Sequence, residues 1–280
     1  MLPGWFELWN FGRPAESEER FRELLSAHPE ASVDWTCQVQ TQVARSLGLQ
    51  RKFEDAHQLL DGVREHWSEL SARTRAYYFL ERGRAFNSGK QPADAEVAFV
   101  EAFGLAKAEG IDDLAVDAAH MLGIVELGER SMEWNRTALR LAEGSDDPRA
   151  RRWVASLCNN LGWTYHDAGE FERALELFQR ALREREAEGT AEQVHIAQWA
   201  VGRCLRSMGR FEEALAIMRV LAGAPDDGYV QEEQGENLLA MGRTEEARPH
   251  FARAYELLRD DPWGDVGEER LQRLQRLGAG

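Results

Sequence analysis

The side chains that could perform chemistry in this chain are its seven histidines, its three cysteines and its many carboxylates. No two histidines have the helical spacing of a zinc protease, and no two cysteines have zinc-ribbon spacing. The sequence also contains no phosphate-binding loop, no dinucleotide-binding fingerprint and no nucleophile elbow. We therefore predict that the protein is not an enzyme and that it binds no metal and no cofactor.

Two histidine neighbourhoods come closest to a site. Asp117 and His120 lie about one helical turn apart and could share a metal ion, but two ligands are insufficient to hold one. His166 is followed directly by Asp167, and adjacent residues on a helix point in different directions. We therefore expect hydrogen-bonded or solvated side chains at both places, and no catalytic dyad at the second.

The cysteines indicate the compartment. Cys37, Cys158 and Cys204 are too few and too scattered for a disulfide framework, so we expect small buried side chains in a reducing cytosol. The N-terminus lacks the basic flank and the long apolar run of a signal peptide, and no run of about 18 apolar residues could span a membrane. We therefore predict a cytoplasmic location.

The net charge limits the partners. The 280 residues carry a formal charge of −15, which repels nucleic-acid phosphates and anionic lipid surfaces. We therefore expect neither a nucleic acid nor a membrane as partner. The charge is compatible with a basic peptide, or with a locally basic groove on an acidic molecule.

A repeated pattern indicates the elements that position these side chains. Its clearest copy lies in residues 158–182, and weaker copies follow in residues 202–218 and 235–254. A small residue marks the point where the second helix of each pair packs on the first, and it recurs at Ser17, Ala56, Ala95, Ser131, Ala174, Ala214 and Ala247. Such a repeat predicts a stack of helix pairs.

Glycines inside the first helix of each pair support this interpretation. They occur at Gly83, Gly162, Gly202 and Gly235. A mid-helix glycine costs about 1 kcal/mol relative to alanine, so four in equivalent places indicate that two helices cross closely there. A second set of glycines is expected in the left-handed conformation at the ends of first helices, namely Gly169, Gly209 and Gly242.

The fourth pair and the N-terminus are less regular. Ser131 follows Gly123 by only eight residues, so about four residues are missing at that turn. We expect a local kink there, and a misaligned pair is the alternative. Near the N-terminus, aromatic residues indicate a truncated first helix that packs on the next pair, or alternatively on a second molecule; they are Trp5, Phe6, Trp9 and Phe11.

Over nearly its whole length, the chain resembles the tetratricopeptide repeat family. The family signature is carried by Leu161, Gly162, Tyr165, Ala174, Phe178 and Ala181, although Cys158 replaces the usual tryptophan. The resemblance implies an all-α fold: a right-handed superhelical solenoid of antiparallel helix pairs, with about six to seven units and a C-terminal capping helix. We expect a single domain over residues 1–280, with a partial first unit in 1–30, the repeat array in 31–262 and the capping helix in 263–280.

The resemblance also implies where a ligand lies. First helices line the concave face of such solenoids, where peptides or extended protein segments usually lie. The candidate ligand-binding residues at the inward positions are Arg45, Tyr77, Arg84, Asn87, His120, Asn159, Trp163, His166, Trp199, Arg203 and Arg206. Arginine binds carboxylates with its planar fork, and arginine and tryptophan are frequent interface anchors.

These residues give two functional hypotheses. The first is a non-catalytic protein–protein interaction scaffold, monomeric or weakly dimeric, whose groove binds a peptide or protein segment with a carboxylate near Arg203 and Arg206. The second is a ligand-responsive regulator that binds a small anionic molecule or a signalling peptide. The competing interpretation is that both arginines pair with acidic neighbours, and that Trp163 and Trp199 are partly core.

Overall fold

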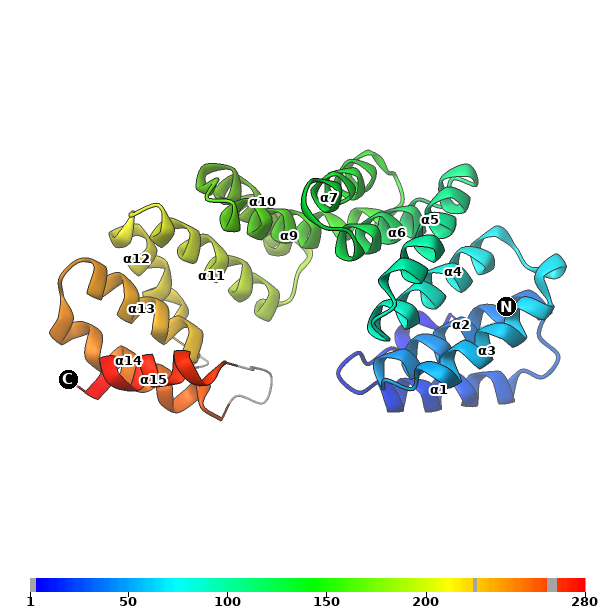
Figure 1. Cartoon of the computed structure of the whole chain (residues 1–280), viewed down its shortest axis with the longest axis horizontal. Helices are drawn as coiled ribbons and strands as arrows, with labels where there is room; N and C mark the ends of the chain where they lie inside the picture. The colour runs from blue at the N-terminus through cyan, green and yellow to red at the C-terminus, as the bar shows by residue number, and fades with distance from the viewer. Residues whose placement is uncertain (1–3, 224–225, 261–265, 280) are drawn as a thin grey trace. The chain divides into compact units, whose positions relative to one another are not determined.

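The computed structural model describes residues 4–223, 226–260 and 266–279. All regular structure in these ranges is helical, which confirms the all-α fold class (Figure 1). The chain forms two compact units, residues 1–157 (unit 1) and residues 158–280 (unit 2). The expected single domain over residues 1–280 stays a prediction.

Unit 1 contains a short 3-10 helix followed by antiparallel helix pairs. Its elements are η1 (Phe6–Leu8), α1 (Pro14–Ala27), α2 (Val33–Leu49), α3 (Phe53–Glu65), η2 (Trp67–Glu69), α4 (Ala72–Ser88), α5 (Pro92–Ala108), α6 (Asp112–Val125), α7 (Gly128–Gly144) and α8 (Pro148–Arg151). The first helices of its pairs are α2, α4 and α6, and each packs on the second helix that follows it.

Unit 2 continues the same alternation. The helix α9 (Trp153–Asp167) begins in unit 1, and all of its residues from Cys158 on belong to unit 2. The remaining elements are α10 (Phe171–Glu188), α11 (Ala191–Ser207), α12 (Phe211–Leu221), α13 (Gly228–Ala240), α14 (Thr244–Leu258) and α15 (Glu268–Ala279). First helices here are α9, α11 and α13.

The glycines inside first helices lie at close helix crossings, as predicted. A Cβ atom built on Gly162 would lie 2.6 Å from Cε1 of Phe178, a side chain with no exposed surface. The same arrangement recurs, always with a spacing of 16 residues, at Gly83 with Phe99, Gly202 with Met218 and Gly235 with Phe251. Any side chain at these glycines would have to displace a buried group, so glycine is required for the packing.

The fourth pair shows the predicted deletion. Gly123 of α6 meets Asn135 of α7, which lies 12 residues later instead of 16. The turn is correspondingly short, because α6 ends at Val125 and α7 begins at Gly128. The Ser131 hydroxyl donates a hydrogen bond to the carbonyl oxygen of Gly123. The pair is therefore in the expected alignment with a shortened turn, while the expected kink stays a prediction.

The turns follow the expected chemistry. Gly169, Gly209 and Gly242 all have φ between 74° and 77°, which is the left-handed region that favours glycine. Arg51 and Lys90 take φ values of 62° and 63° at the ends of α2 and α4. The first two turns of this kind therefore adopt the same backbone conformation without glycine.

Both ends pack as the sequence predicts. The capping helix is present as α15 and packs on α14, with Leu274 fully buried; residues 261–265 and Gly280 lie outside the described residues. At the N-terminal end, the Trp5 side chain is buried in the core of unit 1, which confirms internal packing. Among the described residues, no helix combines the length and the apolar character that a membrane span requires.

Candidate binding faces

Three aromatic rings run across the first helices of unit 2. Trp163 of α9 lies 5.9 Å from Trp199 of α11, measured between ring centroids, and Trp199 lies 6.4 Å from Tyr229 of α13. All three rings are half-buried, and Ile196 beside them on α11 is 52% exposed. We call this surface, together with the charged groups beside it, the unit 2 face.

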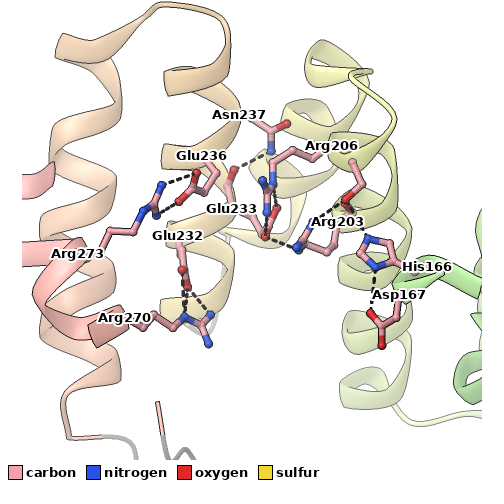
Figure 2. A network of polar contacts seen from close by, with 11 residues as sticks. His166, Asp167, Arg203, Arg206, Glu232, Glu233, Glu236, Asn237, Arg270 and Arg273 are labelled. Carbon is pink, nitrogen blue, oxygen red and sulfur yellow. Dashed lines mark hydrogen bonds and ion pairs between the residues drawn. The ribbon is translucent and has the colours of Figure 1, made fainter. Parts of the chain in front are cut away.

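Two arginines of the unit 2 face share one carboxylate. Arg206 donates to both oxygens of Glu233 at 2.6 and 3.0 Å, and Nε of Arg203 lies 3.1 Å from the same carboxylate (Figure 2). Burial raises the pKa of Glu233, and the two guanidinium groups oppose that rise. The expected pairing of these arginines with an acidic neighbour is thus present in the structure.

Helix α15 neutralises the other two glutamates of α13. Arg270 binds Glu232, and Arg273 binds Glu236, so that a ladder of four arginines and three glutamates connects α11, α13 and α15 (Figure 2). Three of the arginines are needed to balance the three glutamates, which leaves one positive charge in excess on the ladder. Arg203 is the more exposed of the two α11 arginines.

His166 lies at the edge of this ladder. Its Nε2 is 2.9 Å from the Ser207 hydroxyl, which also accepts a hydrogen bond from Nη1 of Arg203 at 2.7 Å. Its Nδ1 is 3.5 Å from the exposed carboxylate of Asp167, outside normal hydrogen-bond distance. Burial lowers the pKa of His166, and the charge of Arg203 lowers it further.

Unit 1 places a balanced set of charges on its first helices. Glu81 of α4 is buried, accepts a hydrogen bond from Arg84 at 2.6 Å and lies 3.7 Å from Arg45 of α2. Arg84 also donates to Asp117 of α6 at 2.5 Å. Two guanidinium groups therefore face two carboxylates, and no charge is in excess among them.

A small pocket of about 190 Å³ lies beside these charges. Arg45, Glu81 and Arg84 contribute to its wall, with Asn87 and Met121. One oxygen of Glu81 has no hydrogen-bond partner among the described residues. The pocket is thus lined by charges of both signs and is smaller than the usual pocket for a drug-sized ligand.

The remaining candidate residues are distributed over both units. Tyr77 of α4 is buried, and its burial raises its pKa to about 12. His120 of α6 packs on Trp153, and burial lowers its pKa. Asn159 of α9 contacts Asn160, its neighbour in the chain. The structure therefore brings five candidates together in unit 1 and five in unit 2, with Asn159 apart; the role of all eleven in binding stays a prediction.

Several residues of these faces were absent from the sequence-based candidates. Glu81 and Glu233 supply the buried countercharges, Ser207 connects His166 to Arg203, and Arg270 and Arg273 come from the capping helix. Of these residues, only Arg270 and Arg273 could have been found from the sequence. They lie three residues apart on one helix, and their partners Glu232 and Glu236 lie four residues apart on another. The three cysteines are buried, as expected.

The stacked hairpins and their polar first-helix faces define a helical-repeat protein. Residues 155–221 match the family model described as tetratricopeptide repeat. The apo form of RapI superimposes with a TM-score of 0.76 at 13% identity, covering 98% of this chain and 78% of that chain. Comparison with curated proteins finds no match.

Two further solved structures have the same fold. The apo form of the quorum sensor NprR from B. thuringiensis gives a TM-score of 0.67 at 16% identity, covering 98% of this chain and 78% of that chain. YrrB, described as a TPR protein with an unusual peptide-binding site, gives 0.50 at 18% identity, covering 72% of this chain and 92% of that chain. These similarities establish the helical-repeat fold.

Proposed function

We propose that the protein is a non-catalytic interaction module and that the unit 2 face binds a peptide or an extended protein segment. The observation that carries the proposal is the row of half-buried rings of Trp163, Trp199 and Tyr229 beside the arginine–glutamate ladder. Rigid aromatic surface next to guanidinium groups is the composition of interface anchors. A peptide-binding site in YrrB, which shares the fold, is consistent with this role.

The charge of the ladder favours a segment that carries a carboxylate. Glu233 neutralises one of the two α11 arginines, so one positive charge remains for a partner. Arg203 is the better placed of the two, because it is more exposed, whereas Arg206 binds Glu233 through two nitrogens. The partner's carboxylate would join the ladder at Arg203, and Glu233 would stay on Arg206.

The Trp199 indole adds a second recognition element. Its Nε1 is buried and has no acceptor among the described residues. An unsatisfied buried donor costs free energy, and a carbonyl group of a bound segment could supply the acceptor after a small movement of the ring. The aromatic row would then position the backbone of the segment, and Arg203 would select its charge.

The alternative, a regulator that binds a small anionic molecule, has less support from the charges. The pocket of unit 1 is lined by Arg45 and Arg84, but Glu81 and Asp117 already neutralise both groups. An added anion would meet no excess positive charge there. Inorganic phosphate and citrate should therefore leave the melting temperature unchanged, and a rise of several degrees would favour the regulator instead.

The test uses the full-length protein and an array of short synthetic peptides in acidic, basic and neutral series with matched aromatic content. We expect selective binding of acidic peptides, and Arg203→Gln should weaken it about tenfold, the usual effect of one lost charge-assisted contact. Trp199→Ala should weaken all series. Arg183→Gln, an exposed change on the second helix α10, is the matched control. Equal binding of acidic peptides by the Arg203 variant and the control would contradict the proposal.

A further inference from the structure

The N-terminal segment, residues 4–12, lies on the first-helix face of unit 1. Trp5 Nε1 donates to Oε1 of Gln38 at 3.3 Å, and Trp9 Nε1 donates to Oε1 of Gln42 at 3.3 Å. Both glutamines belong to α2 and lie four residues apart, so they share one helix face. Two indoles spaced by four residues therefore meet two amide acceptors spaced by four residues.

The rings of the segment also cover candidate ligand residues. Trp5 packs edge-on against Tyr77 of α4 at a centroid distance of 5.5 Å and is only 5% exposed. The guanidinium of Arg45 lies 5.5 Å from the centroid of the Trp9 ring and 5.3 Å from that of Phe11. Gln38, Arg45 and Tyr77 are inward positions of the repeat, where a family ligand would lie.

The backbone of the segment is held much more weakly than its side chains. Its only regular element is the three-residue helix η1, whose hydrogen bonds run from Leu8 to Trp5 and from Trp9 to Phe6. Among the described residues, the first backbone hydrogen bond to a group outside the segment is at Asn10, whose N–H donates to the Ser17 hydroxyl of α1 at 2.7 Å. Phe6 and Phe11 remain more than half exposed.

A short segment anchored by two aromatic side chains has the contact pattern of a bound peptide. A first helix that belongs to the array packs instead along its whole length on its neighbours. We propose that the surface formed by Gln38, Gln42, Arg45 and Tyr77, which we call the unit 1 face, is a recognition site for segments with two tryptophans four residues apart. Residues 4–12 occupy it as a tethered, exchangeable ligand. The proposal is independent of the function proposed for unit 2, because it concerns other helices and another ligand chemistry.

The hydrogen-bond acceptors on α2 indicate which side chains this face binds. Gln38 and Gln42 offer uncharged oxygens that match indole N–H groups, and Tyr77 and Arg45 offer ring and cation contacts to the same indoles. Since the tether holds the segment at a millimolar effective concentration, an external segment of the same kind competes poorly until the tethered one is removed or weakened. In the free protein, the tethered segment therefore blocks the binding of an external segment to this face.

The first test uses the full-length protein with Trp5→Ala and Trp9→Ala together, and a fluorescent synthetic peptide of residues 1–13 as the probe. We expect the peptide to bind this variant at least about tenfold more tightly than the wild type, because the tethered competitor is lost. A peptide with both tryptophans replaced by alanine should not bind. Adding Gln38→Leu to the variant should reduce binding, and circular dichroism confirms that each protein is folded.

The second test needs no substitution. Hydrogen–deuterium exchange of the unaltered protein should show residues 4–12 exchanging fully while α2 and α4 remain protected, as expected of an exchangeable ligand on a stable face. Protection equal to that of α2 would show that the segment is a permanent part of the core and would overturn the proposal. Equal binding of the peptide to variant and wild type, or binding to neither, would overturn it as well. Arg203→Gln should leave all of these results unchanged.

Discussion

Single side chains on the unit 2 face have charge states set by burial and by their neighbours. The Ser207 hydroxyl connects His166 to the guanidinium of Arg203, and both the burial of the imidazole and that positive charge disfavour a second proton on the ring. At neutral pH the unit 2 face therefore holds a neutral histidine. At Glu233 the two influences on the pKa oppose each other, because burial disfavours the negative charge and two arginines favour it.

The lowered pKa of His166 predicts a pH dependence of stability. Below the unfolded-state value of about 6.5, the unfolded chain binds a proton at this histidine that the folded chain does not, so stability is lost as pH falls. His166→Gln removes this term, and its loss of stability between about pH 7.5 and about pH 5.5 should be smaller than that of the wild type by at most about 1.4 kcal/mol.

Urea unfolding at the two pH values measures this difference. Asn160→Gln, a change at an exposed residue of the same helix that has no titratable group, is the control and should keep the wild-type pH dependence. A variant at His166 that loses as much stability as the wild type would show that the ring is protonated equally well in both states.

At the scale of elements, the helix pairs were predictable and their charge pairing was not. Gly83, Gly162, Gly202 and Gly235 stand out in a sequence because each is unfavourable in a helix unless packing requires it. Even the shortened turn after Gly123 could be predicted, because a fixed spacing was interrupted. Such signals are local, and each needs only the residues of one hairpin.

The faces depend instead on contacts that connect distant residues. Nothing in the sequence near Arg206 indicates that Glu233 will bind it, since that pairing depends on how α11 packs beside α13. The position of Trp5 was even less accessible, because its hydrogen bond to Gln38 spans 33 residues and involves no regular element longer than three residues. The location of the candidate residues on first helices was thus predictable, but their partners were not, and their role in binding stays a prediction.

The close crossings of helix pairs yield a prediction at this scale. Gly162→Leu would place a side chain where Phe178 already lies, and it should destabilise unit 2 by about 1–3 kcal/mol through overpacking. Gly104→Leu in α5 is the matched control, because a Cβ there meets open space and leucine is the better helix former. Thermal unfolding followed by circular dichroism compares the two. If Gly162→Leu leaves the melting temperature unchanged, α9 and α10 can move apart without a cost in stability.

At the scale of the whole molecule, the chain forms two compact units, and within each unit hairpins contact their neighbours. In such arrays stability is approximately a sum of local terms, so a defect should weaken the hairpins around it and spare distant ones. Gly83→Ala introduces a Cβ against Phe99 in unit 1, and Gly235→Ala does the same against Phe251 in unit 2. The two substitutions are therefore matched defects, one in each unit.

Hydrogen exchange of the two variants shows how far each defect spreads. We expect Gly83→Ala to speed exchange in α2–α5 and to leave α13–α15 at the wild-type rate, while Gly235→Ala does the reverse. The physical reason is that each hairpin buries its surface mainly on adjacent hairpins, so the free energy of local opening depends on those contacts. If either variant speeds exchange equally along the whole chain, residues 1–280 unfold as one cooperative domain. A partner bound at one face would then stabilise both units, whereas local unfolding confines its effect to the unit that it contacts.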